Sequence, residues 1–176
     1  MTPADTLTLY HAGPDDAATY ARVARDTFYH SYHALSDPAT MVTHLHRSFS
    51  EGIQRDELED AANTVLVARA GDRSWAGFMS LRTGVPPACV STSPSLHLAR
   101  LYAVREWHGR GAGPFLLDAA HDHARHAGCH GLWLQVWERN ARARRFYEKH
   151  GFVEVGTHPY RFGDEWEDDL VLERRV

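Results

Sequence analysis

The first third of the chain follows a helical period of hydrophobic positions after one short alternating segment. Residues 6–11 alternate polar and apolar side chains as a strand does. The segment 13–16 (GPDD) is typical of a helix start, because proline and acids suit the first turn, and the apolar stripe behind it extends to Tyr32. A second helix is expected from residues 36–38 (SDP) onward, and a short third helix around 56–61.

From Thr64 onward the hydrophobic period becomes that of strands. Two strands, 64–70 and 74–81, are joined through the turn residues 71–73 (GDR) and predict a hairpin. Residues 83–94 hold three prolines and are expected to form a long loop. The elements expected after this loop are a strand at 96–104, a helix that ends near 127, a strand at 132–137, a helix at 141–150, and strands at 152–158 and 166–173.

This order of elements predicts a mixed sheet with helices packed against it, in the α/β (α+β) class. The 176 residues suit one hydrophobic core, and no linker, repeat or low-complexity tract divides them. We therefore expect a single domain over residues 1–176.

Composition and charge narrow the class of protein. Lys and Arg number 19 against 23 Asp and Glu, and the resulting net charge of −4 gives no general attraction to nucleic acid. Cys89 and Cys129 lie far apart without a metal-binding spacing, which favours a reducing, cytoplasmic compartment. No apolar run is long enough to cross a bilayer, and the first residues lack a secretory pattern, so membrane and secreted proteins are disfavoured.

The histidines near the end of the long helix invite a metal-site interpretation, but their spacing is unfavourable. His121 and His123 point to different faces of a helix, and Gly128 separates His126 from His130. We therefore expect a solvated helix face and no metal. Four arginines at the start of the last helix either contact the phosphates of a nucleotide or form a solvated basic face; they are Arg139, Arg142, Arg144 and Arg145.

The segment 108–113 (HGRGAG) stands between an expected strand and an expected helix, and it carries the clearest chemical signal. Glycines allow positive φ and close approach of the backbone, and a helix N-terminus offers free N–H groups to an anion. A diphosphate suits this geometry, although a plain tight connection also would. A Rossmann dinucleotide site is the main rival, and Glu138 does end the next strand. However, Pro114 stands three residues after Gly111, where that fingerprint needs glycine or alanine, and only one further helix follows.

Two motifs together resemble the GNAT (GCN5-related) N-acetyltransferases. The first is His108-x-x-Gly111-x-Gly113, which departs from that family's Gln/Arg-x-x-Gly-x-Gly/Ala only at its first position. The departure leaves open whether a side chain at 108 contacts phosphate. The second motif runs through the next strand and helix, and a finer likeness is to the branch of PaiA-type polyamine N-acetyltransferases; the motif is Leu134-x-Val136-x-x-x-Asn140-x-x-Ala143-x-x-x-Tyr147-x-x-x-Gly151-Phe152.

The resemblance implies a fold and a co-substrate. It implies a mixed, mostly antiparallel twisted sheet of about seven strands with four or so helices, in which the strands 96–104 and 132–137 run parallel and splay apart. Acetyl-CoA would be the co-substrate, with its pantetheine arm in the gap, and no metal is implied. The residues expected to bind it are Leu101, Tyr102, Ala103, His108, Gly109, Arg110, Gly111, Ala112, Gly113, Asn140 and Tyr147.

The resemblance also implies that an amine attacks the thioester directly. Tyr147 would protonate the leaving thiolate, although a helix tyrosine also suits a core, and Asn140 could simply cap the last helix. For the base we expect His97, because strand alternation places 97, 99, 101 and 103 on one face. Glu138, Tyr102 and a water relay are the alternatives for this step.

The acceptor is expected to be a small amine, polyamine-like or another amino metabolite, in preference to a protein N-terminus or lysine. The aromatic residues Phe28, Tyr29 and Tyr32, with His33, either line its pocket or form a core stripe. A non-catalytic acyl-CoA sensor is the alternative from another class, and Tyr147 argues against it. The resemblance leaves a homodimer open.

Overall fold

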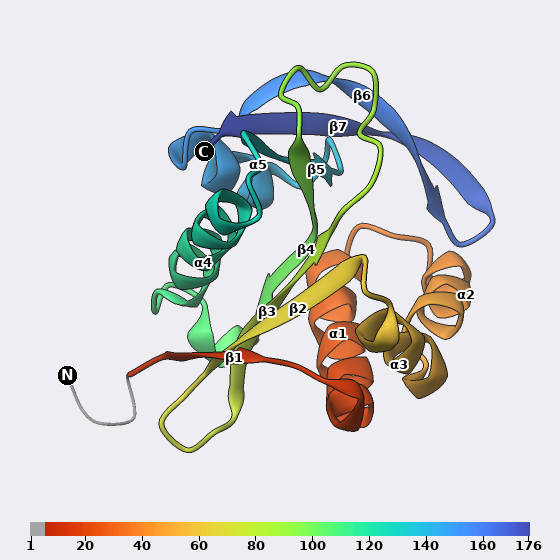
Figure 1. The fold of residues 1–176 in the computed structure, drawn as a ribbon. Helices are drawn as coiled ribbons and strands as arrows, with labels where there is room; N and C mark the ends of the chain where they lie inside the picture. The colour runs from red at the N-terminus through yellow and green to blue at the C-terminus, as the bar shows by residue number, and fades with distance from the viewer. Residues whose placement is uncertain (1–5) are drawn as a thin grey trace.

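A computed structural model describes residues 6–176 of the protein (Figure 1). The first five residues begin the N-terminal segment judged above to lack a secretory pattern, and they lie outside the described residues. The elements of the described chain are the strands β1 (Thr8–His11), β2 (Asn63–Arg69), β3 (Trp75–Arg82), β4 (Ser95–Ala103), β5 (Gly131–Val136), β6 (Val153–Phe162) and β7 (Glu165–Arg175), the helices α1 (Ala17–Tyr32), α2 (Pro38–Ser48), α3 (Glu51–Glu59), α4 (Ala112–His126) and α5 (Ala141–Lys149), and the short 3₁₀ turns η2 (Pro14–Asp16) and η3 (Arg105–Trp107).

The strands form one sheet in the order β1-β2-β3-β4-β5-β7-β6, and β4 and β5 are its one parallel pair within residues 6–176. These two strands pair only where residues 95–97 lie beside 131–133. Beyond that point both continue, β4 to Ala103 and β5 to Val136, and they separate (Figure 1). The seven-stranded mixed sheet with a splayed parallel pair is therefore confirmed.

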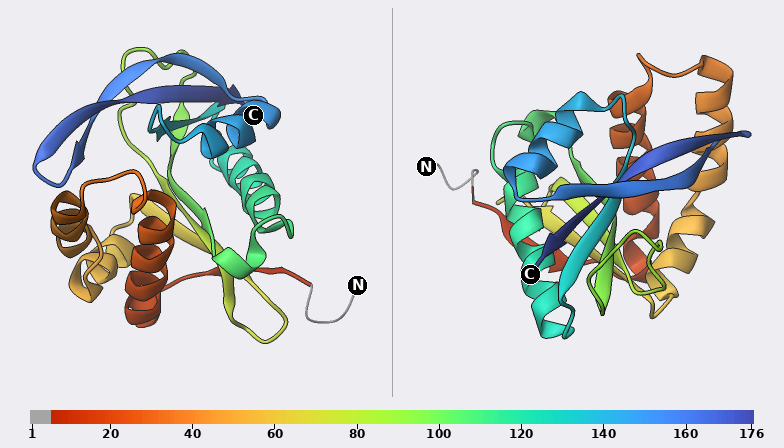
Figure 2. Two further views of the ribbon diagram at one scale, coloured as in Figure 1. Left: turned by 180° about the vertical axis from the view of Figure 1, so that it is seen from behind. Right: turned by 90° about the horizontal axis from the view of Figure 1, so that it is seen from above.

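Helices cover both faces of the sheet, with α4 and α5 on one face and α1, α2 and α3 on the other (Figure 2). Each face has its own hydrophobic core. Leu116 of α4 packs with Leu132 of β5 in one core, and Tyr20 of α1 packs with Phe78 of β3 in the other. The fold class predicted from the order of elements is confirmed.

Two element boundaries differ from the predictions by more than two residues. Helix α3 begins at Glu51, five residues earlier than expected, because Ser50 caps it by accepting a hydrogen bond from the Ile53 N–H at 3.3 Å. Strand β6 continues to Phe162 instead of ending near 158. It can pass through Pro159 because β6 is an edge strand of the sheet, where a missing N–H is tolerated.

The pairing of β4 with β3 contains a β-bulge at Ala99. Ser80 pairs with Arg100 but Leu81 pairs with Leu98, so one residue of β4 has no partner on β3. A bulge of this kind reverses which face of the strand the following side chains occupy. The residues after Ala99 therefore do not continue the alternation that precedes it.

This bulge makes one expectation wrong, namely that residues 97, 99, 101 and 103 share a face. His97 and Tyr102 line the same cavity on the side of α1. Leu101 and Ala103 instead pack into the core beneath α4. Pattern alone could not reveal this, because the sequence of β4 contains no glycine or proline to mark the bulge.

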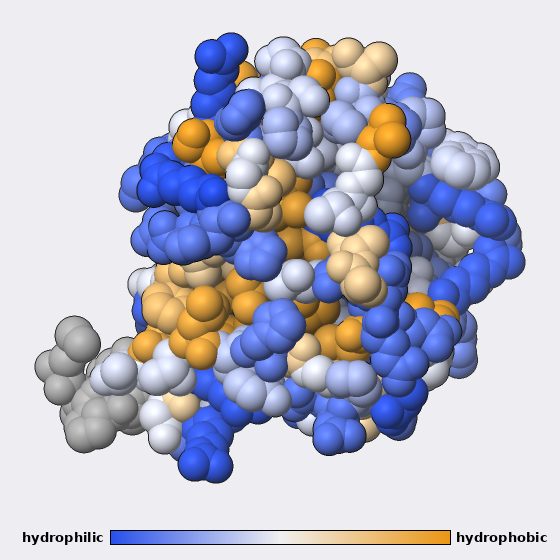
Figure 3. Space-filling view, in the orientation of Figure 1, coloured by the Kyte–Doolittle hydropathy of each residue, from blue (hydrophilic) through white to orange (hydrophobic). Residues whose placement is uncertain are grey.

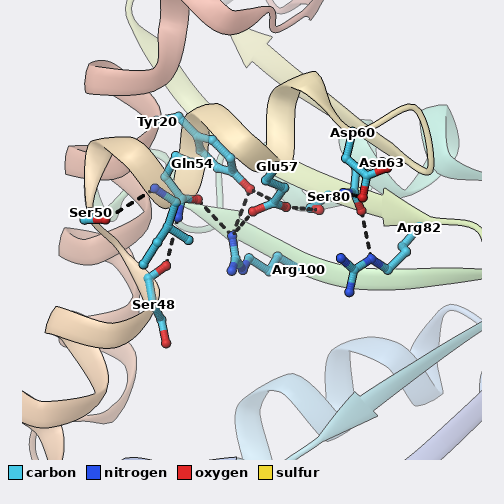
Figure 4. A network of polar contacts seen from close by, with 11 residues as sticks. Tyr20, Ser48, Ser50, Gln54, Glu57, Asp60, Asn63, Ser80, Arg82 and Arg100 are labelled. Carbon is cyan, nitrogen blue, oxygen red and sulfur yellow. Dashed lines mark hydrogen bonds and ion pairs between the residues drawn. The ribbon is translucent and has the colours of Figure 1, made fainter.

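A buried polar network holds the bulge in place (Figure 4). Arg100 Nη1 donates hydrogen bonds to the hydroxyl of Tyr20 at 3.0 Å, Gln54 Oε1 at 3.0 Å and Glu57 Oε2 at 2.8 Å. Ser80 Oγ donates to the other oxygen of Glu57 at 2.6 Å. The side chain after the bulge is thus tied to α1, α3 and β3.

The β6–β7 hairpin arches away from the sheet until its tip meets α2 (Figure 1). At the tip Arg47 Nη1 donates to the carbonyl oxygen of Gly163 at 3.1 Å and pairs with Asp164. Gly163 has φ +61°, and a Cβ there would lie 2.7 Å from Cγ2 of Thr40. A glycine is therefore required for the tip to approach α2 this closely.

Three findings concern the classes considered from composition. No helix within residues 6–176 is both long and apolar enough to cross a membrane. Cys89 and Cys129 are free thiols. In the described part of the chain, no three His, Cys, Asp or Glu side chains are grouped so that they could hold a metal ion.

Candidate active site

The candidate active site lies where β4 and β5 separate in the middle of the sheet. On the face seen in Figure 3, hydrophobic residues gather over this central region between hydrophilic flanks. The glycine-rich connection leaves the carboxyl end of β4, and α5 follows the carboxyl end of β5 after a short turn. The gap between the strands is therefore bordered by the two sequence motifs.

The glycine-rich connection forms a tight turn that leads directly into α4. The Arg110 N–H donates to the Trp107 carbonyl oxygen at 3.2 Å, and Gly109 and Gly111 have φ values of +73° and +90°. Gly111 is the N-cap of α4, and a Cβ on it would meet nothing within 4 Å. Glycine is therefore needed for its backbone conformation, while the space before it is open. The first N–H groups of α4 have no acceptor within the helix, which suits a diphosphate.

His108 occupies the first position of this motif, and its side chain turns back toward the strand. Its Nε2 donates to the carbonyl oxygen of Ala103 at 3.0 Å. Partial burial and the positive charge of Arg142 on α5 lower the pKa of the imidazole. The neutral ring thus fixes the end of β4 against the turn.

Asn140 begins α5 and joins it to α1. Its Oδ1 accepts a hydrogen bond from the Ala143 N–H at 3.1 Å, so the capping alternative considered above is confirmed. Its Nδ2 donates to the hydroxyl of Tyr32 at 3.4 Å. A capping role does not exclude contact with the co-substrate.

Tyr147 lies on the buried face of α5, beside the gap between the strands. The residue is 8% exposed, and its ring packs against Phe152 with centroids 5.5 Å apart. Its hydroxyl makes no hydrogen bond to any residue between 6 and 176, and burial together with Tyr32 raises its pKa. The phenol is therefore fully protonated at neutral pH, as a proton donor must be.

A cavity of about 300 Å³ opens on the α1 side of the same gap. Both diverging strands contribute to it, and the β6–β7 hairpin and the start of α2 close it on the far side. Four carboxylates face it against one guanidinium, that of Arg139. The lining residues are Phe28, Tyr32, Leu35, Ser36, Asp37, Thr40, His97, Ala99, Tyr102, Gln135, Trp137, Arg139, Tyr160, Phe162, Glu165, Glu167 and Asp169.

His97 reaches this cavity but is a weak base. Its ring stacks on Trp133 with centroids 3.8 Å apart and planes inclined by 3°. Burial, with the charges of Arg82 and His158, lowers its pKa to about 4. At neutral pH the imidazole is thus uncharged and has little affinity for a proton.

Other predicted residues are placed less favourably for contact with an acceptor. Glu138 is exposed and does not line the cavity. Phe28 and Tyr32 do line it, while Tyr29 and His33 stack on each other outside it at 4.7 Å. Phe28 and Tyr32 therefore belong both to the pocket wall and to the core stripe of that helix, whereas Tyr29 and His33 belong to neither.

Sequence reasoning missed the carboxylates of β7. Glu165, Glu167 and Asp169 lie at alternate positions of β7 and all line the cavity. The alternation of acids in 165–169 (EWEDD) is a signal that could have placed them on one face. That face of β7 lines the cavity because the β6–β7 hairpin curves over α1 and α2.

Comparison with known proteins gives both a family and relatives. Residues 28–152 match the model of the acetyltransferase (GNAT) family. An uncharacterised N-acetyltransferase of Mycobacterium bovis is 30% identical over 161 residues, covering 92% of this chain and 98% of the relative.

Solved structures share the fold over nearly the whole chain. The PaiA N-acetyltransferase of Thermoplasma acidophilum, in complex with coenzyme A, is similar with a TM-score of 0.77 and 20% identity, covering 97% of this chain and 99% of that one. The spermidine/spermine N-acetyltransferase SpeG of Vibrio cholerae is similar with a TM-score of 0.65 and 18% identity, covering 96% and 93%. At these identities the likeness concerns the fold alone.

Proposed function

Because the chain belongs to the GNAT family of acetyltransferases, we propose that it moves an acetyl group from acetyl-CoA to a primary amine of a small, cationic, polyamine-like acceptor. The observation that carries this proposal is the cavity beside the splayed strands. Its wall combines aromatic rings with carboxylates, the two kinds of group that hold an alkylammonium chain. The acceptors in the name of the spermidine/spermine N-acetyltransferase SpeG, spermidine and spermine, are consistent with this choice.

In this proposal acetyl-CoA is held by the glycine-rich connection and the gap between the strands. The turn at residues 109–113 receives the diphosphate at the N-terminus of α4, where the space in front of Gly111 is open. The main chain of Leu101, Tyr102 and Ala103 pairs with the pantetheine arm, since β4 lacks a strand partner on its β5 side there. His108 contributes by fixing the turn, because its ring is engaged with the Ala103 carbonyl group.

Tyr147 is proposed as the acid that protonates the departing CoA thiolate. Its raised pKa keeps the proton on the phenol until a strong base forms beside it. Asn140 supports this arrangement indirectly, by capping α5 and by linking it to Tyr32. A purely CoA-binding sensor would have no use for a buried, unpartnered phenol at this place.

The β6–β7 hairpin bounds the cavity on one side, which favours a small acceptor over a protein. The tip of the β6–β7 hairpin rests on α2 through the hydrogen bond between Arg47 and Gly163. An extended peptide would need an open groove in this place. The cytoplasmic location and the homodimer considered above both stay predictions.

A panel of amines tests the proposed function. Acetyl-CoA is titrated into the protein by calorimetry, and CoA release is then followed with 1,4-diaminobutane, spermidine, n-butylamine and a lysine-containing peptide. Release that requires a small amine supports the proposal. Tight acetyl-CoA binding without release for any amine would favour the sensor, and release with the peptide alone would favour a protein acetyltransferase.

A further inference from the structure

Asp169 is a buried carboxylate without a partner in the described chain. It is 6% exposed, its Oδ1 is fully buried, and no residue between 6 and 176 donates a hydrogen bond to its carboxylate or forms an ion pair with it. A buried carboxylate is normally paired, because losing hydration is costly. Nonetheless Asp169 lines the cavity, where a ligand could supply the missing partner.

No basic side chain between residues 6 and 176 forms an ion pair with Asp169, although Arg139 lines the same cavity. Glu167, two residues earlier on β7, lies on the same face and adds a second negative charge. Burial and Glu167 together raise the pKa of Asp169 to about 7. The titratable and charged groups that face it from the packed elements are Tyr32 of α1, Asp37 before α2, His97 and Tyr102 of β4, Arg139 after β5, His158 and Tyr160 of β6, and Glu165 and Glu167 of β7.

Resting on the function proposed above, we propose that Asp169 binds the reacting ammonium of the acceptor and takes its proton, in place of His97, and that Glu167 and Glu165 hold a second ammonium of the same molecule. The carboxylates stand two residues apart on one strand, a spacing of about 6.8 Å at 3.4 Å per residue. An extended four-carbon diamine spans a comparable length. The aromatic rings of Tyr160 and Phe162 on the paired strand β6 line the same cavity and would contact its methylene groups.

The proton balance of the step is complete without any further reagent. The ammonium gives one proton to Asp169, and the neutral nitrogen forms a bond with the thioester carbon. The carbon–sulfur bond breaks, and the sulfur takes a proton from the phenol of Tyr147. The second proton that leaves the nitrogen restores the phenol, and Asp169 releases its proton to solvent.

The pH dependence of kcat/KM separates the two candidate bases. With 1,4-diaminobutane, wild type should show a rising limb near pH 7, because Asp169 must be ionised to accept a proton. Asp169→Asn is nearly isosteric and should lose this limb, lower kcat by roughly 10²- to 10⁴-fold and keep the wild-type affinity for acetyl-CoA. His97→Gln should keep the limb. A profile in which His97→Gln loses the limb and Asp169→Asn keeps it overturns the proposal.

Asp168→Asn is the matched control, because Asp168 carries the same charge one residue away, is exposed and does not line the cavity. It should behave as wild type. A second control is 2,2,2-trifluoroethylamine, whose amine is already neutral at pH 7.5 and needs no base. Asp169→Asn should lose far less activity with this amine than with n-butylamine. Equal losses would show that Asp169 does not act as a proton acceptor.

The role of Glu165 and Glu167 is tested by the preference for 1,4-diaminobutane over n-butylamine, because the two amines differ by the second ammonium. Glu167→Gln should reduce this preference, measured as the ratio of kcat/KM for the two amines, by roughly tenfold, the scale of one charge-assisted contact, because any effect of the change on the base Asp169 is common to both amines. An unchanged preference overturns this part of the proposal. If wild type acetylates no amine, the proposed function itself falls; if it does so and Asp169→Asn matches it, only the present inference falls.

Discussion

Replacing Asp169 by asparagine should stabilise the folded protein at alkaline pH, whatever it does to activity. The pKa of Asp169 rises from 3.8 to about 7 on folding, so the folded state favours the protonated carboxyl. Its contribution to stability is therefore full below pH 3.8 and is lost as the pH rises through 7. Asparagine cannot ionise and avoids this loss.

The size of the effect follows from the shift. About three pKa units correspond to roughly 4 kcal/mol at 1.36 kcal/mol per unit. More than half of this change, about 2–3 kcal/mol, falls between pH 5 and pH 8, because the folded carboxyl titrates near pH 7.

Urea unfolding at pH 5 and at pH 8 measures this difference, with the free energy of unfolding of the variant compared with that of wild type at each pH. The advantage of Asp169→Asn should grow with pH, while Asp168→Asn should follow wild type. A variant that gains nothing between pH 5 and pH 8, or that becomes less stable than wild type, would refute the reasoning that Asp169 is an unpaired buried carboxylate.

Three further changes test the co-substrate site, the acid and the network at the bulge. Gly111→Val places a Cβ where the φ of +90° disfavours it and where a phosphate is expected, so calorimetry should show at least a 100-fold loss of acetyl-CoA affinity, whereas Gly84→Val in the exposed loop should bind normally. Tyr147→Phe should lower kcat by roughly 10²- to 10⁴-fold with acetyl-CoA affinity intact, and an unchanged kcat would leave the residue a purely packing role. Arg100→Met should lower the free energy of unfolding by about 3 kcal/mol, and adding Glu57→Leu should recover part of it; a loss below ~1 kcal/mol would contradict a structural role for the network.

The sequence predicts the half of the site that depends on local geometry. Gly111 predicts a positive φ at the start of α4, because glycine adopts that conformation readily. Asn140 predicts the start of α5, because an asparagine side chain can cap a helix. The parallel pair β4 and β5 follows from the helix between them. Each of these features is set within a segment of about ten to twenty residues, and the order of residue types within such a segment is enough to predict it.

The acceptor half of the site depends on contacts between distant segments. The bulge at Ala99 is stabilised by Tyr20, Gln54 and Glu57, which lie 42 or more residues away along the chain, and so it left no mark in β4 itself. Asp169 reaches the cavity because the β6–β7 hairpin curves toward α2. Asp168 beside it is an exposed acid, and the residue types alone do not show which of the two aspartates is buried.

The short contact between β4 and β5 has a consequence for the order in which the substrates meet the protein. Residues of both strands, among them Ala99 and Gln135, form the wall of the cavity, and between the strands that wall is unfinished. Acetyl-CoA lying in the gap would complete this wall. An amine that binds before acetyl-CoA would therefore meet an incomplete binding surface. In the proposed function the donor would thus prepare the surface that the acceptor recognises, and by the reciprocity of coupled equilibria a bound amine would raise the affinity for the donor by the same factor.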